Sequence, residues 1–270
     1  MRAETFLNVF TRFISTRGKP SHMYSDNGTN FEGASNILKD FQELTTIVES
    51  PEVFNAMAND GITWHFNPPA APHHGGVWEI NVKAVKMHLR RMLVEDAYTY
   101  EEFLTLLKGV EAIVNSRPLS TISQNPDDLE PLTPGHFLIG TSLLAPPEPD
   151  YQDIKLNRLN RYQLLRRKLQ EFWTRWSQEY LGRLQKRSKW AEESPNFQVD
   201  DRVLIIEENV PCMKWNIGRI IEVHKGKDDR VRVVTLETQC GYDKNGKRFS
   251  KVFKRPISKL ALLPKHDNDD

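Results

Sequence analysis

Residues 67–79 read Asn67-Pro68-Pro69-Ala70-Ala71-Pro72-His73-His74-Gly75-Gly76-Val77-Trp78-Glu79. This stretch joins two segments whose hydrophobic residues recur with different periods. Residues 62–66 before it alternate and are β-branched or aromatic, which predicts a strand. The prolines make the joining segment extended and its glycines make it mobile, so we expect a loop there. Residues 77–93 after it repeat with a helical period. This succession of strand, loop and helix predicts an α/β fold.

The predicted helix 77–93 has two distinct faces. One face is apolar and contains Trp78, Val82, Val85, Leu89, Met92 and Leu93. Beside it lie Glu79, Lys83, Lys86 and Arg90, at positions i, i+4, i+7 and i+11. A carboxylate in line with three cations suits a helix that holds a metal at one end and follows a phosphate backbone along the rest. Glu–Lys pairing on a solvated face is the simpler interpretation of this pattern alone.

The N-terminal residues predict a helix followed by a strand. Residues 3–17 have the stripe of an amphipathic helix, and His22–Ser25 predicts a short buried strand. Asp26-Asn27-Gly28 is a turn signal at the end of that strand. The carboxylate of Asp26 would therefore lie at the C-terminal edge of a strand, where α/β folds place their chemistry. Residues 33–60 look helical and irregular.

The second half of the chain predicts helices and then a β domain. Residues 100–116 and 154–190 have helical periodicity, and the longer tract carries aromatic residues every three or four positions and cations on its other faces. Past Pro195, short β-branched runs predict a small barrel or sandwich. These runs are residues 202–206, 218–223, 230–237 and 251–263. We favour burial of Trp215 in that domain over stacking on a base.

Charge is distributed unevenly along the 270 residues, although the formal net charge is only +1. Residues 1–150 hold 11 Lys+Arg against 19 Asp+Glu, whereas residues 151–270 hold 26 against 17. An acidic body with a basic appendage favours a phosphate-rich partner, with a solvated basic surface as the alternative. No apolar run approaches the ~18 residues of a membrane span, so we expect no membrane partner. Cys212 and Cys240 match no zinc spacing.

Several motifs, in order along the chain, carry a resemblance to a known family. They are Tyr24-Ser25-Asp26-Asn27-Gly28-Thr29-Asn30-Phe31, residues 67–79, Asn115-Ser116-Arg117-Pro118-Leu119, residues 132–140, residues 214–220 and residues 254–260. Together they resemble the integrase of BEL/Pao-type LTR retrotransposons. The resemblance covers nearly the whole chain.

The resemblance implies a catalytic core with an RNase H-like fold. In this family an Asp, Asp, Glu triad holds two Mg²⁺ or Mn²⁺ ions and joins a 3′-hydroxyl to a target phosphodiester, because carboxylates suit hard cations and a metal pair stabilises both attacking and leaving oxygens. Asp26 matches the second carboxylate and Glu79 the third. The first Asp has no counterpart here, so we expect an N-terminally truncated core that binds metal weakly and does not catalyse strand transfer alone.

The same resemblance sets the expected organisation and partners. Residues 1–150 would form the partial core, 151–192 a basic helical linker, 193–265 a small SH3-like β-barrel that binds nucleic acid, and 266–270 a disordered tail. The expected DNA-contacting residues are Lys83, Lys86, Arg90, His73, His74, Arg166, Arg167, Lys168, Lys186, Arg187, Lys254 and Arg255.

The expected partners are element ends and target DNA, bound by a homo-oligomer in the nucleus. A catalytically dead, domesticated or relic DNA-binding protein is the alternative.

Overall fold

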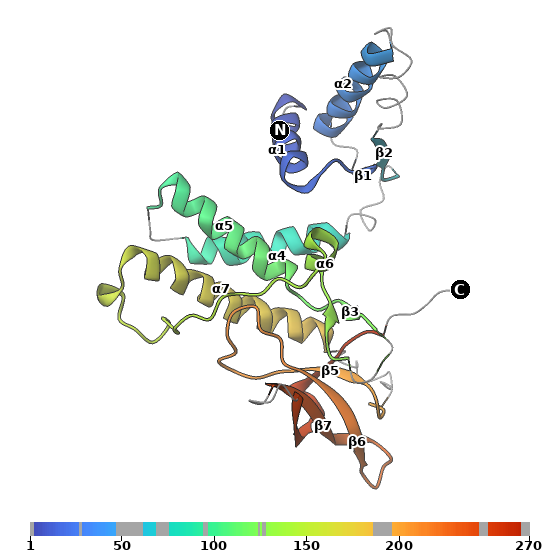
Figure 1. Cartoon of the computed structure of the whole chain (residues 1–270), viewed down its shortest axis with the longest axis vertical. Coiled ribbons are helices and arrows are strands. Elements are labelled where there is room, and N and C mark those ends of the chain that lie inside the picture. Colours follow the sequence, from blue (N-terminus) through green and yellow to red (C-terminus); the bar gives the residue numbers. More distant parts are fainter. Residues whose placement is uncertain are drawn as a thin grey trace. The chain divides into compact units, whose positions relative to one another are not determined.

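The chain is a mixed α/β protein that divides into two compact units, Met1–Ala84 and Val85–Asp270. The computed structural model describes residues 3–26, 29–46, 62–68, 76–93, 97–123, 125, 128–185, 196–242 and 248–265 (Figure 1). The predicted tail 266–270 lies outside these residues. The division falls inside helix α4 (Gly76–Met92). In the described part of the chain, no helix combines the length and apolar character that crossing a bilayer requires.

The first unit contains helices α1 (Ala3–Arg17) and α2 (Thr29–Thr46) and strands β1 (His22–Ser25) and β2 (Thr63–Phe66). The strands are parallel, with His22 opposite Thr63 and Ser25 opposite Phe66. On one side of them Phe6 of α1 packs near the Trp64 ring, with 5.9 Å between centroids. The predictions of helix 3–17 and of both strands are confirmed.

The prediction that His22–Ser25 forms a buried strand is wrong for most of its length. Only Ser25 is buried, whereas His22 and Tyr24 are exposed. The described sheet of this unit has two strands, and its apolar packing against α1 covers one side. Alternation therefore leaves every second side chain of β1 on the uncovered side.

The second unit is built around helices α5 (Tyr100–Asn115) and α7 (Arg161–Leu184). Figure 1 shows them side by side. A Cβ atom added at Gly109 would lie 2.6 Å from Leu169, so the two helices approach closely at this glycine. His88 of α4 also contacts α7, because its Nε2 lies 2.6 Å from a Glu179 carboxylate oxygen. The helix predicted over 154–190 is shorter than expected, and residues 156–158 form a separate 3₁₀ turn, η2 (Leu156–Arg158).

Trp215 lies at the centre of an aromatic cluster in this unit. Its ring meets Trp173 of α7 edge-on, with 4.8 Å between centroids, and lies 5.7 Å from the Tyr180 ring. Its indole nitrogen donates to the hydroxyl of Ser116 at the end of α5. Trp215 is half-buried, and its ring packs against helix α7 and not inside the β domain, so the expected burial is confirmed only in part.

The C-terminal strands form one antiparallel sheet in the order β8-β7-β6-β5-β9. The strands are β5 (Arg202–Ile205), β6 (Ile217–Lys225), β7 (Val231–Tyr242), β8 (Arg248–Pro256) and β9 (Leu260–Leu262). The edge strands β8 and β9 do not pair, so the sheet is not closed into the predicted barrel. The run 251–263 is also not one strand, because a 3₁₀ turn, η3 (Ile257–Lys259), follows Pro256 and redirects the chain.

Buried Arg202 connects the sheet to the segment that follows α5. This segment contains strands β3 (Ser120–Thr121) and β4 (Pro131–Leu132) and leads into helix α6 (Pro134–Ile139). Its guanidinium donates to the carbonyl oxygens of Ser123 and Asn125. The backbone amide of Thr121 donates in turn to the carbonyl of Pro264, at 3.1 Å. The sheet therefore belongs to the same compact unit as α5 and α7 and is not a detached appendage.

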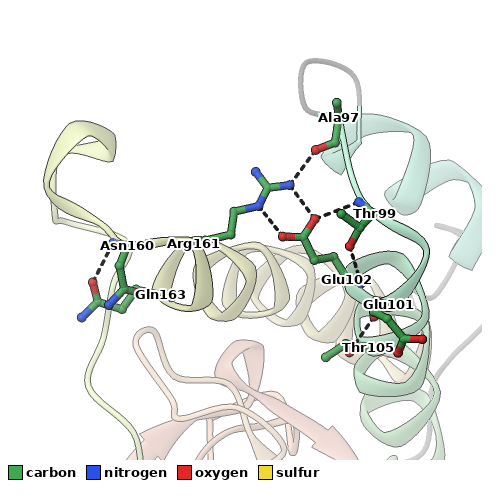
Figure 2. Close-up of polar contacts among 8 residues, drawn as sticks. All are labelled: Ala97, Thr99, Glu101, Glu102, Thr105, Asn160, Arg161 and Gln163. Carbon is green, nitrogen blue, oxygen red and sulfur yellow. Dashed lines mark hydrogen bonds and ion pairs between the residues drawn. The ribbon is translucent and has the colours of Figure 1, made fainter.

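The first turns of α5 and α7 are tied together by one ion pair (Figure 2). Arg161 Nε donates to Glu102 Oε1 at 2.6 Å, and Arg161 Nη2 donates to Glu102 Oε2 at 2.8 Å. Glu102 also accepts from the backbone amide of Thr99, the N-cap of α5. The hydrogen bond from Arg161, together with that from Thr99, lowers the pKa of Glu102 from 4.5 to about 2.

We predict that replacing Glu102→Gln lowers the melting temperature of the second unit at neutral pH but not in strong acid. A carboxylate whose pKa is lower in the folded state stabilises that state above its unfolded pKa of 4.5, and this stabilisation is lost as the pH falls toward about 2. Thermal unfolding of both proteins from pH 7 downward measures the difference. Glu101→Gln is the matched control, and an equal effect of both substitutions would contradict the assignment.

We also predict that Trp215→Ala lowers the free energy of unfolding of the second unit by about 3 kcal/mol, because large-to-small substitution leaves a cavity between α7 and the sheet. Urea unfolding followed by circular dichroism measures the loss. Tyr162→Ala on α7 is the control, since Tyr162 is 67% exposed and its removal should change stability by less than about 0.5 kcal/mol. Equal stability of Trp215→Ala and the wild type would refute the central role of Trp215.

Candidate nucleic-acid interface

Asp26 follows directly after β1, at the carboxyl end of the parallel strand pair. The backbone amide of Asn67, which follows β2, donates to the carbonyl of Ser25 at 2.9 Å. Asp26 and Asn67 therefore leave the two strands at the same edge of the sheet. Asp26 is exposed. The edge position predicted for this carboxylate is confirmed.

Helix α4 carries the predicted row of charged residues, and Glu79 lies in its first turn. The side chain of Glu79 is outside the part that the structure describes. Lys83, Lys86 and Arg90 are exposed, and they form no ion pair with another described residue. The stripe from Lys83 to Arg90 extends about 10 Å along the helix axis. Lys83 and Lys86 are three residues apart and Lys86 and Arg90 are four apart, so their like charges repel one another, a cost that a bound polyanion would relieve.

Three of the cations of α7 are engaged within the fold. Arg166 Nε donates to Glu148 at 2.5 Å, and this hydrogen bond raises the pKa of Arg166. Arg167 donates to Glu171, and Lys168 donates to the carbonyl of Met92 at 3.2 Å. These three predicted DNA contacts thus bind the helix to its own surroundings, and a phosphate would have to compete with their present partners.

The two predicted contacts on β8 differ from each other. Lys254 is exposed, and it pairs in the sheet with Thr235 of β7. Arg255 is half-buried, lies 4.5 Å over the Phe253 ring and donates to Glu207 at 3.1 Å. Lys254 is the better placed of the two for a phosphate.

The remaining predicted contacts lie outside the described residues. They are His73, His74, Lys186 and Arg187.

Arg117 of the Asn115-Ser116-Arg117-Pro118-Leu119 motif acts at the end of α5. Its Nη1 donates to the carbonyl of Val114 at 2.8 Å. Burial lowers the pKa of Arg117, and the neighbouring Tyr180 partly offsets that effect. This geometry satisfies one of the unpaired carbonyls at a helix C-terminus.

Among the described residues, no group of three or more His, Cys, Asp or Glu side chains is arranged to hold a metal. A divalent metal would find a carboxylate oxygen at Asp26, which is the donor type that Mg²⁺ and Mn²⁺ prefer.

The second unit also contains a cavity of about 650 Å³ that the sequence did not reveal. Pro146, Glu148, Trp173, Cys212 and Trp215 are among the residues that line it. Glu148 is already bound to Arg166, and Gln170 donates to it as well. Burial, reinforced by the Glu148 carboxylate, raises the pKa of the Cys212 thiol to about 12. The cavity thus holds a thiol that is protonated at neutral pH.

We predict that Cys212 resists alkylation in the native protein. With a pKa of about 12, fewer than about one thiol in 10,000 is ionised near pH 8, and the thiolate is the reactive form. Iodoacetamide treatment followed by mass spectrometry of the peptide that contains Cys212 measures the modification. The same peptide should react fully in denaturant, which serves as the internal control. Fast labelling of the native chain would show that the thiol is open and ionised.

Comparison with known families gives a match in the second half of the chain. Residues 160–263 match the model of DUF5641, a family of unknown function. The matched segment begins at Asn160, the N-cap of α7, and ends at Leu263, directly after β9. It therefore includes both α7 and the sheet that packs against it. No curated protein matches the sequence.

Proposed function

We propose that this chain is a DNA-binding protein of the integrase type, related to the integrases of BEL/Pao LTR retrotransposons. The observation that carries the proposal is the exposed row of Lys83, Lys86 and Arg90 on the helix that also bears Glu79. In this proposal the first unit is part of an RNase H-like core, and the C-terminal sheet is an open relative of SH3-like domains.

Asp26 and Glu79 would hold Mg²⁺ or Mn²⁺ in this protein. The exposed position of Asp26 at a strand's carboxyl end supports its part in this site. Such an ion would supply Lewis-acid polarisation of a phosphodiester when bound. The residues of the chain itself would position the DNA backbone, with the cations of α4 neutralising phosphates along the helix that bears Glu79.

DNA binding is common to an active integrase and to a catalytically silent relative. Testing the α4 cations therefore addresses the part of the proposal that both forms share. The dependence of DNA affinity on salt concentration is more informative than a single affinity. Each cation that contacts a phosphate releases counterions from the DNA, so the slope of log K against log salt reports the number of such contacts.

We predict that the triple variant Lys83→Gln, Lys86→Gln, Arg90→Gln binds duplex DNA more weakly and with less salt dependence than the wild type. Loss of three phosphate contacts should reduce the slope of log K against log salt by about 3. Fluorescence anisotropy of a labelled duplex, titrated with the full chain at several salt concentrations, measures this slope.

The control variant removes the same charge elsewhere, by Lys19→Gln, Lys39→Gln and Lys108→Gln. Lys108 already pairs with Glu111 at 2.7 Å. If both triple variants change the slope equally, net charge and not the α4 stripe governs binding. If the wild-type chain does not bind DNA at low salt, the proposed function is wrong.

A further inference from the structure

One face of the β1–β2 pair carries two histidines in contact. The parallel register places His22 opposite Thr63 and Tyr24 opposite His65, so His22, Tyr24 and His65 share the face of the sheet that is turned away from Phe6 and Trp64. His22 and Tyr24 are exposed and His65 is half-buried. The Tyr24 ring stacks on the His65 ring at 4.6 Å, which restricts the orientation of the imidazole.

Ring nitrogens of the two histidines converge. His22 Nδ1 lies 3.0 Å from His65 Nε2. Two nitrogens that bind one metal at bonds of about 2.0 Å lie about 2.8 Å apart in adjacent square-planar positions and about 3.3 Å apart in a tetrahedral site. The observed separation falls between these values. Both imidazoles could therefore bind one ion with shifts of a few tenths of an ångström.

We propose that His22 and His65 form a two-nitrogen site for a divalent transition metal of the Zn²⁺ or Cu²⁺ type, which clamps β1 to β2. Apart from their mutual contact and ring stacking, the two imidazoles have no partner among the described residues. Water completes the coordination on the exposed side.

A clamp would matter because this strand pair is short. Each strand has four residues, and a two-stranded sheet is marginally stable by itself. A metal that binds the folded pair and not the unfolded chain stabilises the pair in proportion to its occupancy. The site is distinct from the proposed Mg²⁺ position, because imidazole nitrogen favours Zn²⁺ and Cu²⁺ whereas the Asp26 carboxylate favours hard cations. The proposal therefore does not depend on the proposed function.

The test uses the full chain, stripped of metal with a chelator and titrated with ZnCl₂ or CuCl₂ by calorimetry. We expect a binding event that His22→Gln and His65→Gln each weaken by about tenfold or more. Electron paramagnetic resonance of the Cu²⁺ complex should show coupling to two nitrogens in the wild type and to one in either variant. Glutamine keeps these strand positions polar, and circular dichroism of the metal-free variants reports whether they are folded.

Two control variants separate this site from others. The double variant His73→Gln, His74→Gln and the variant Asp26→Asn should both retain the wild-type affinity for Zn²⁺ and Cu²⁺. Zinc should also raise the melting temperature of the wild type but not that of His22→Gln. Equal affinity of the wild type and His22→Gln, or loss of binding in the His73/His74 variant, would overturn the proposal.

Discussion

The packing of Trp215 against α7 is the contact on which the second unit depends. Its ring meets Trp173, Trp176 and Tyr180 edge-on, and its nitrogen reaches Ser116 at the end of α5. Trp215 packs against both the helical core and the apolar cluster between α7 and β9. One side chain thereby connects α5, α7 and the sheet. The matched family segment, which includes α7 together with the sheet, is consistent with this dependence.

This packing changes how the charge of the chain should be interpreted. Part of the basic excess of residues 151–270 is neutralised within the fold, because several cations of α7 and of the sheet lie beside carboxylates. These pairs include Arg161–Glu102, Arg166–Glu148, Arg167–Glu171, Arg183–Glu179 and Arg219–Glu237. The net acidic half also carries exposed cations, those of α4. Net charge by segment is therefore a poor guide to where a phosphate can bind.

The sequence was sufficient to predict most helices and strands, because hydrophobic period reports which residues are covered. Period does not report which element covers them, so the contact of Trp215 with α7 and the clamp of Arg202 on Ser123 and Asn125 could not be foreseen. The sequence predicted a closed barrel and not an open sheet. The β-branched run 251–263 looked like one strand, although a 3₁₀ turn after Pro256 divides it. For the candidate site, the turn residues after β1 predicted the edge position of Asp26. The ion pair of Arg166 could not be predicted in the same way, because its partner Glu148 lies in another segment of the chain.

Strand β1 separates two side chains of different donor type, the imidazole of His22 and the carboxylate of Asp26, which are too far apart to bind one ion. His22 begins the strand and Asp26 follows its end, so four residues of extended chain separate them by about 13 Å. One ion cannot be bound by both at bonds of about 2 Å. If both proposed sites bind metal, each would therefore hold its own ion, with nitrogen favouring Zn²⁺ or Cu²⁺ and the carboxylate favouring Mg²⁺ or Mn²⁺. A metal bound at His22 and His65 would hold β2 beside β1 and so keep Asp26 and Asn67 at one edge, which couples the two sites through the strand pairing.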